Sequence, residues 1–218
     1  MKRWIAMLLA WSMALSLAAC TKPQEKGKET VSEADAAQET TTEAEEPAAY
    51  YPVTVTDQAG REVVIEEEPQ KLVSGYYIST SLMIALELDD KLVGIEAKAD
   101  KRPIYSLAAP ELLELPNVGS AKEFDLEGCA ALQPDLVVLP LKLKDAAQTL
   151  EELGIHVLLV NPEDQQQLTE MIELIAKATN TQKRAQQLLD FTEAQQKELE
   201  TMLAGAPTPT AYLAGNSD

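Results

Sequence analysis

The chain has 218 residues with 36 acidic and 18 basic side chains, a formal charge of −18, and 45% apolar residues. These are globular proportions, so disorder throughout the chain is excluded. The net negative charge argues against a nucleic-acid partner, which would need a basic face. One histidine and two cysteines exclude a disulfide framework and disfavour a zinc site built from Cys and His. The length suits one domain with additional segments.

The first twenty residues have the pattern of a bacterial secretory signal. Met1–Arg3 is basic, and the uncharged run over 4–19 is short for a membrane-spanning helix. The run 17–20, Leu-Ala-Ala-Cys, resembles a lipobox, a signal whose cysteine is acylated and becomes the first residue of the mature chain. The resemblance implies a lipid anchor on Cys20, on the extracytoplasmic face of the cell membrane. The alternative is an uncleaved anchor with an incidental cysteine.

Residues 21–49 are rich in acidic side chains, threonine and alanine. A segment with so few large apolar residues cannot bury enough surface to become ordered. We therefore predict a disordered linker, and a flexible coil of this length spans roughly 30 Å. Its negative charge would also keep it away from an anionic membrane surface.

Strand and helix patterns alternate after the linker. Residues 53–56 and 61–65 alternate apolar and polar side chains around Asp-Gln-Ala-Gly, which predicts a β-hairpin. Continuously apolar runs typical of strands buried on both faces of a parallel sheet follow at 71–74, 92–95, 136–139 and 156–160. The predicted helices are 79–88, 126–132, 145–153 and 164–179. Because such crossovers are right-handed, the expected fold class is α/β, with residues 50–180 forming a helix–sheet–helix lobe.

Individual residues fit this pattern. Asp125 stands where an N-cap belongs, and Cys129 is expected in the core as a small apolar residue. His156 heads a buried strand and is interpreted as structural rather than as a ligand or base. The last predicted helix of the lobe places four apolar residues on one buried face, namely Leu168, Met171, Ile172 and Ile175.

A longer helix is predicted over residues 181–204, which contain neither proline nor glycine. Its length would be about 36 Å, and its glutamines make it too polar to lie inside a core. Residues 205–209 break it, and 210–215 have the pattern of a new strand. Because a strand without a following partner is not a natural end, we expect the chain to be truncated there.

Taken together, these segments resemble the ABC-importer substrate-binding proteins that carry iron–siderophore complexes, haem or vitamin B12. The resemblance covers residues 53 to about 215 and implies two α/β lobes joined by one long helix, with the ligand gripped between them. Residues 205–218 would then begin the second lobe. The matching stretches are Val53–Ile65, Leu86–Ile95, Asn117–Gly119, Asp125–Gly128, Leu132–Val138, Leu153–Val157 and Ile175–Thr179.

The resemblance also implies a way of working. Such a protein is a monomeric receptor that hands its solute to an ABC permease and ATPase, performs no chemical reaction and holds no resident cofactor. The solute itself would be a metal chelate, and no metal site made by the protein is expected. In the family, an acidic residue at the position of Glu127 pairs with arginines of the permease. The alternative for Glu127 is a solvated glutamate in the first turn of a helix.

Open α/β sheets bind ligands at the carboxyl ends of their strands. Two of the loops expected there hold a local excess of positive charge, which favours an anionic ligand such as a ferric siderophore. Arg102 is the preferred contact because its planar guanidinium recognises carboxylates through two bonds. Ordinary solvated surface residues are the alternative. The basic residues of the two loops are Lys98, Lys101, Arg102, Lys142 and Lys144.

Two tyrosines and a serine complete the predicted ligand face. Tyr76 and Tyr77 directly follow the first buried strand and could stack on a planar ligand, although a packing role fits them nearly as well. Ser79 opens a predicted helix whose N–H groups could hold an oxyanion, and helix capping explains it equally well. Haem is the least favoured ligand, because only these tyrosines could supply an axial bond.

Two other classes of function stay open. One is a surface-tethered hydrolase whose catalytic groups lie outside this chain, and the other is a sensor or adhesin module on the same scaffold. The chain contains no Gly-Xaa-Ser-Xaa-Gly elbow, no P-loop and no His-Glu-Xaa-Xaa-His motif. The sequence therefore favours a binding protein.

Overall fold

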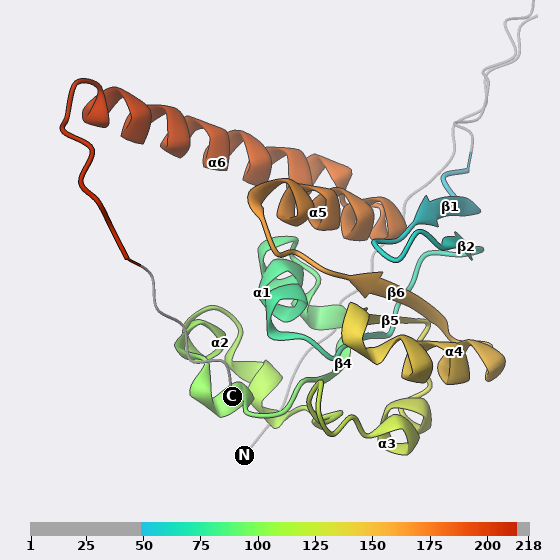
Figure 1. Ribbon diagram of the computed structural model, residues 1–218. Helices are drawn as coiled ribbons and strands as arrows, with labels where there is room; N and C mark the ends of the chain where they lie inside the picture. Colours follow the sequence, from blue (N-terminus) through green and yellow to red (C-terminus); the bar gives the residue numbers. More distant parts are fainter. Residues whose placement is uncertain (1–48, 213–218) are drawn as a thin grey trace, which may run out of the picture. The chain divides into compact units, whose positions relative to one another are not determined.

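A computed structural model describes residues 49–212, which are built around one parallel sheet (Figure 1). The strand order in this sheet is β4-β3-β5-β6, and every neighbouring pair is parallel. The predicted parallel sheet is therefore confirmed, with strand ends displaced by at most one residue. The strands are β3 (Leu72–Ser74), β4 (Leu92–Ile95), β5 (Leu136–Pro140) and β6 (His156–Val160).

Helices connect these strands as predicted, and one further helix had not been predicted. The α-helices are α1 (Tyr77–Ala85), α2 (Pro103–Ala108), α3 (Leu126–Ala131), α4 (Lys144–Glu152) and α5 (Gln165–Thr179). Short 3₁₀ turns are η1 (Asp89–Lys91), η2 (Ala99–Lys101), η3 (Pro110–Glu114) and η4 (Leu141–Leu143). Neither α2 nor η3 was predicted, and each begins with a proline. Both prolines stand at the start of their helix, where a missing N–H breaks no hydrogen bond.

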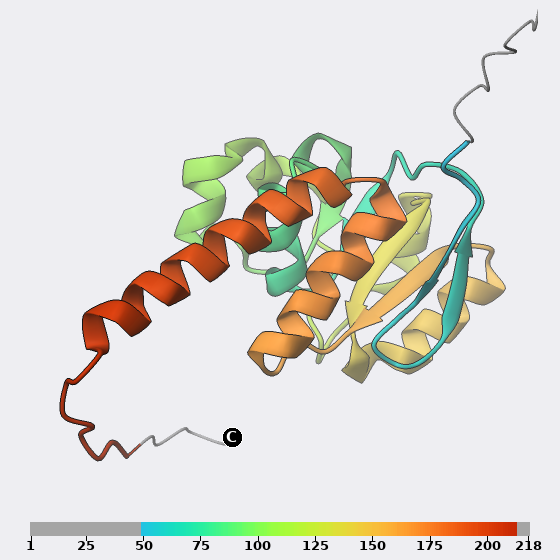
Figure 2. The same ribbon diagram turned by 90° about the horizontal axis from the view of Figure 1, so that it is seen from above.

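Alternate residues of the central strands belong to two different hydrophobic cores. Leu136, Val138, Leu158 and Val160 pack in a core with α1, α5 and the start of α6. Val137, Leu139, Val157 and Leu159 pack in a second core with α3 and α4. Figure 2 looks down on the face covered by α5 and α6. The predicted helix–sheet–helix arrangement is therefore confirmed.

Cys129 lies fully buried in the second core, as predicted. Burial, reinforced by the nearby Asp125 carboxylate, raises the pKa of its thiol to about 11. Because the thiolate is the reactive form of cysteine, this residue acts as a packing group at neutral pH.

The predicted hairpin consists of β1 (Val53–Thr56) and β2 (Glu62–Ile65), which pair antiparallel. It contacts α5 through β1 and the edge strand β6 through β2. The turn between the strands is fixed by Asp57, whose carboxylate is completely buried. Its Oδ1 accepts from the backbone N–H groups of Ala59 and Arg61. Its Oδ2 accepts from the Arg61 guanidinium and, across to β6, from the N–H of Leu159 at 3.0 Å.

A second carboxylate fixes the other end of the sheet. Asp135 precedes β5, and its Oδ2 accepts from the backbone N–H groups of Gln70 and Lys71, each at 2.8 Å. These residues stand immediately before β3. Asp135 therefore sets where β3 begins relative to β5.

Helix α6 (Gln182–Leu203) agrees with the long helix predicted over 181–204. Its first turns pack on α5, with Ala185 buried between the two helices. Arg184 holds the end of α1, because its Nε donates to the carbonyl of Ala85 at 2.9 Å. From residue 193 to its end, every side chain of the helix is exposed. Much of α6 thus extends away from the sheet (Figure 1).

The chain has no regular structure at residues 206–212. The strand predicted over 210–215 therefore does not begin at residue 210, and residues 213–215 lie outside the described range. A strand needs the edge of another strand for its hydrogen bonds, and residues 206–212 pair with none of the described strands. The predicted signal, Cys20 and nearly all of the predicted linker also lie outside the described residues. None of the helices within 49–212 combines the length and apolar character that crossing a membrane requires.

Candidate functional site

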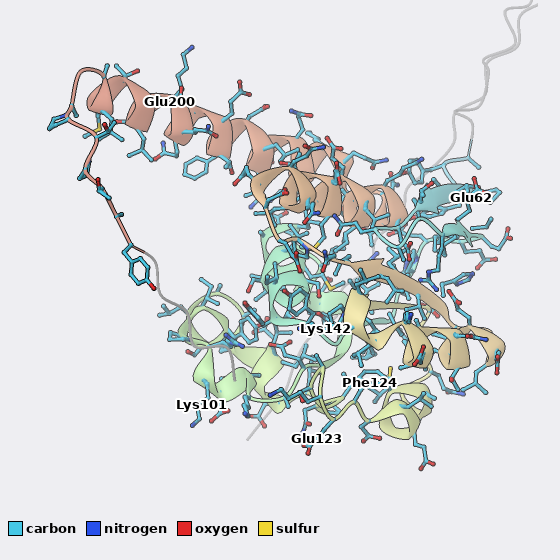
Figure 3. The ribbon with its side chains drawn as sticks, viewed as in Figure 1. Glu62, Lys101, Glu123, Phe124, Lys142 and Glu200 are labelled. Atoms are coloured by element: carbon cyan, nitrogen blue, oxygen red, sulfur yellow. The ribbon has the colours of Figure 1, made fainter. Side chains whose placement is uncertain are left out.

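The carboxyl ends of the four parallel strands meet at one edge of the sheet. Because β3 lies between β4 and β5, the loop with Tyr76 and Tyr77 stands between two others. The loop after β4 carries Lys98 and Arg102, and the turn after β5 carries Lys142. Strands two positions apart are separated by roughly 10 Å, so these basic loops flank the tyrosines. Figure 3 shows Lys101 beside α2 and Lys142 near the start of α4.

Tyr77 and Arg102 form a stacked pair at this edge. Tyr77 is the first residue of α1 and Arg102 is the N-cap of α2. The central carbon of the Arg102 guanidinium lies 4.0 Å from the centroid of the Tyr77 ring. Tyr76 meets Tyr77 edge-on, with ring centroids 5.2 Å apart. The structure thus brings together three of the predicted ligand-binding residues.

The edges of the Arg102 guanidinium are unused. Within residues 49–212 its side chain makes no hydrogen bond and no ion pair, and its Nε is buried without a partner. The stack on Tyr77 occupies one face of the guanidinium plane and Nε is buried, so the two terminal NH₂ groups are the ones left for a ligand. A guanidinium held in this way suits a planar oxyanion such as a carboxylate.

The other basic residues at this edge differ in how far they are neutralised. Lys101 lies 2.8 Å from the carboxylate of Asp100, and this hydrogen bond raises the pKa of Lys101 and lowers that of Asp100. Lys98 is exposed and holds a left-handed backbone conformation with φ of 67°. Lys142 is exposed in η4. Lys98 and Lys142 therefore add positive charge on either side of the tyrosines.

Ser79 does not lie on the exposed face. It is fully buried, its hydroxyl donates to the carbonyl of Tyr76 at 2.8 Å, and its Oγ lies 2.7 Å from that of Ser74. Helix α1 begins at Tyr77, two residues earlier than predicted. Two residues along a helix correspond to about 200°, which turns Ser79 to the side opposite Tyr77. Its hydroxyl holds the backbone of the loop at Tyr76 from the buried side, so it does not face a ligand.

A buried carboxylate lies behind the stacked pair. Glu96 directly follows β4, is 5% exposed, and accepts hydrogen bonds from the hydroxyls of Tyr105 at 2.7 Å and Thr80 at 2.6 Å. Burial, then the hydrogen bond and the charge of Glu96, raise the pKa of Tyr105 well above its usual range. Glu96 was not predicted as a functional residue. A carboxylate placed directly after an apolar strand was the available signal.

The pKa of Tyr76 is also raised, mainly by its burial and then by Tyr77 and Glu163. Glu163 comes from the loop after β6. The Tyr76 phenol is therefore a neutral hydrogen-bonding group.

Glu127 lies on α3, an element that carries none of the predicted ligand-binding residues. It is exposed in the first turn of α3, and Asp125 caps that helix as predicted, since its Oδ1 accepts from the N–H of Gly128 at 2.8 Å. The preceding loop is tied to the end of β4, because the N–H of Ala97 donates to the carbonyl of Gly119 at 2.7 Å. Gly119 has φ of +85°, and an added Cβ would lie 2.1 Å from the carbonyl oxygen of Glu123. Only glycine fits there.

Metal ligands do not cluster in the described part of the chain. Residues 49–212 contain no group of three or more His, Cys, Asp and Glu side chains placed to hold a metal ion. His156 lies at the start of β6, at the opposite end of that strand from the ligand face, with its Nδ1 3.2 Å from the carbonyl of Asp135.

Comparisons with known proteins agree with this architecture. A family model described as periplasmic binding protein matches residues 72–218. The uncharacterized ABC transporter substrate-binding lipoprotein YvrC of Bacillus subtilis (strain 168) is 30% identical over 232 residues, 97% of this chain and 66% of that protein.

Solved structures are similar in fold. The molybdate periplasmic binding protein MolA of Haemophilus influenzae, bound to molybdate, has 20% identity and a TM-score of 0.65 over 71% of this chain and 55% of its own. The siderophore-binding protein BauB, bound to a complex of two acinetobactin molecules and ferric iron, has 18% identity and a TM-score of 0.59. That match covers 72% of this chain and 56% of BauB.

The chain thus spans 66% of the curated relative and about half of the solved structures. The sequence match runs from β3 through α6, which includes the strand ends, the stacked pair and the long helix. We conclude that the chain belongs to the periplasmic binding protein family.

Proposed function

We propose that the protein is an extracytoplasmic solute-binding lipoprotein that delivers a ferric siderophore, or a similar metal complex such as a cobamide or haem, to an ABC importer. The observation that carries this proposal is the Arg102 guanidinium, which is stacked on Tyr77 and whose N–H groups make no hydrogen bond within residues 49–212. An anionic ligand with planar oxygen groups fits that arrangement. The names of the similar proteins support it, since MolA holds molybdate and BauB holds a ferric siderophore.

Each residue at the carboxyl edge then has a role in binding. Tyr76 and Tyr77 stack on flat parts of the ligand, and Arg102 pairs with its oxyanion. Lys98 and Lys142 raise the local positive potential in a chain that is acidic overall. Ser79 is left out, because its hydroxyl is buried behind the tyrosines. No bond is made or broken, and the ligand itself carries the metal.

The remaining parts of the proposal concern attachment and partners. Acylation of Cys20 would anchor the protein to the membrane, and a diacylated cysteine binds a bilayer stably where one chain would be marginal. The word lipoprotein in the name of YvrC supports this. The partners are an ABC permease with its ATPase, reached by the monomeric receptor through Glu127.

The ligand class is tested by titration. Both tryptophans, Trp4 and Trp11, precede Cys20, so tyrosine fluorescence is the probe for the processed chain. We expect saturable quenching by a ferric tris-catecholate complex and none by the iron-free chelator. Free N-acetyltyrosinamide corrects for light absorbed by the coloured complex. Saturation by haem or cobalamin alone would reassign the ligand, and no saturation by any of the three would contradict the proposal.

The docking role of Glu127 is tested by charge reversal. Glu127→Lys should lower uptake of the bound solute in cells to a small fraction, because a lysine repels the permease arginines. The affinity for the ferric probe should stay unchanged, since Glu127 lies on α3, which carries none of the predicted ligand-binding residues. The matched control is Glu170→Lys, an exposed glutamate on α5, which should transport normally. Reduced ligand affinity in Glu127→Lys would refute the role.

A further inference from the structure

Glu96 is a buried carboxylate that is not among the proposed ligand contacts. It is 5% exposed, and no cationic group of the described residues lies within ion-pair distance of it. Its hydrogen-bond partners are two neutral hydroxyls, those of Thr80 and Tyr105. Burying a carboxylate without a cation is costly unless strong hydrogen bonds compensate. An apolar residue would fill this space at lower cost, so the carboxylate has a more specific task.

The two hydroxyl donors come from different helices. Thr80 lies in α1, and its Oγ1 is also 2.7 Å from the Ser74 hydroxyl at the end of β3. Tyr105 lies in α2, is fully buried, and its hydroxyl stands 3.2 Å from the carbonyl of Tyr77. Glu96 itself follows β4. One carboxylate thus ties α1, α2 and the ends of two strands together.

These helices carry the two halves of the stacked pair. Tyr77 opens α1, and Arg102 is the N-cap of α2, three residues before Tyr105. Three residues are nearly one helical turn, so fixing Tyr105 also fixes the start of α2. The 4.0 Å separation between Arg102 and the Tyr77 ring therefore depends on where the Tyr105 hydroxyl is held.

A carboxylate is needed at position 96 because two hydroxyl groups donate to the same side chain. Each hydroxyl has a single proton, and an ionised carboxylate accepts from both donors at once. The Tyr105 hydroxyl can donate either to Glu96 at 2.7 Å or to the Tyr77 carbonyl at 3.2 Å, and the shorter bond to a charged acceptor is the stronger. If the carboxylate is removed, the Tyr105 hydroxyl donates to the Tyr77 carbonyl, which is 3.2 Å away, and α2 shifts toward that carbonyl from the position that Glu96 had held.

We infer that Glu96 is a positioning residue that, through Thr80 and Tyr105, holds α2 against α1 so that Arg102 stays stacked on Tyr77 with its N–H groups toward the ligand. The inference depends on the proposed function only for the identity of the ligand face. The positioning itself is measurable without any ligand.

The test follows Arg102 by NMR in the full chain. The Tyr77 ring current shifts the Arg102 side-chain protons upfield, and Tyr77→Leu provides the spectrum without the ring. Glu96→Gln leaves one carbonyl oxygen and adds two N–H donors, and Tyr105→Phe removes only the hydroxyl. Both variants should move the Arg102 Hδ and Nε–H signals at least half of the way toward those of Tyr77→Leu.

The matched control is Tyr51→Phe. It also removes one partly buried tyrosine hydroxyl, which donates to the carbonyl of Ala178 at 3.1 Å and lies outside this network. The control should leave the Arg102 signals in place even if it lowers stability to a similar degree. Circular dichroism checks that each variant is folded, and Glu96→Gln and Tyr105→Phe are independent tests of the same bond.

Unchanged Arg102 signals in Glu96→Gln and Tyr105→Phe, with shifted signals in Tyr77→Leu, would overturn the inference. With the ferric probe, we expect Tyr105→Phe to weaken binding about tenfold, which corresponds to about 1.4 kcal/mol. If the wild-type chain binds none of the probes, the proposed function fails while the NMR comparison still decides the role of Glu96.

Discussion

Asp57→Ala is expected to lower the free energy of unfolding by roughly 3 kcal/mol, because it removes a buried charge from its hydrogen-bonded partners. The carboxylate of Asp57 is completely buried and serves two backbone N–H groups of its own turn, the Arg61 guanidinium and the N–H of Leu159. Without it, a buried strand N–H loses its acceptor. Among residues 49–212, Arg61 then keeps Glu151 at 2.8 Å and the carbonyl of Val157 at 3.0 Å.

Urea unfolding followed by circular dichroism measures this effect. The control is Asp100→Ala, which removes an exposed carboxylate paired with its neighbour Lys101, and we expect no measurable change in the free energy of unfolding there. Asp57→Asn should fall between wild type and Asp57→Ala, since the amide keeps one acceptor oxygen and places N–H groups against other donors. Equal stability of Asp57→Ala and Asp100→Ala would contradict this account of the hairpin turn.

Arg102→Lys is expected to weaken binding of the ferric probe by about 10- to 100-fold. A charge-assisted hydrogen bond contributes about 1.5–3 kcal/mol, and each 1.4 kcal/mol is a factor of ten in the dissociation constant. Lysine keeps the charge but has neither the planar face that lies 4.0 Å from the Tyr77 centroid nor the paired N–H groups. Tyr77→Leu should act in the same direction, because it removes the surface on which Arg102 is held.

Equilibrium dialysis with the ferric probe measures these affinities. Arg184→Lys is the matched control, since it makes the same change at α6, where the guanidinium donates to the carbonyl of Ala85. Its affinity should equal that of the wild type. If Arg102→Lys binds as tightly as the wild type, the ligand does not use the guanidinium and the role of the stacked pair is wrong.

The sequence predicted the sheet well because continuous apolar runs have few alternatives in a chain of this composition. The runs at β4 and β6 match the observed strands residue for residue. Helix α2 was not predicted, and it begins at Pro103, a residue type that more often interrupts a helix than starts one. A proline at a helix start and a proline in a loop have the same local signal.

The candidate site was predictable only as a set of loops. Parallel strands place their carboxyl ends together, so Tyr76, Tyr77, Arg102 and Lys142 could be assigned to one edge. Which of them touch depends on α2 and on the bond between Glu96 and Tyr105, and no periodic pattern encodes that bond. The inward direction of Ser79 followed from a helix start displaced by two residues.

Strand slippage is the hazard that the two-core arrangement creates. In a strand with one solvent-exposed face, a shift by one residue would bury polar side chains, and the free-energy cost would prevent it. Strand β5 is apolar and buried on both faces, so the same shift would only exchange one apolar surface for another. The alignment must then be enforced by polar groups outside the strand. Two aspartates are placed to fix this alignment. The Asp135 carboxylate accepts hydrogen bonds from two backbone N–H groups just before β3, and the Asp57 carboxylate accepts one from the N–H of Leu159 in β6.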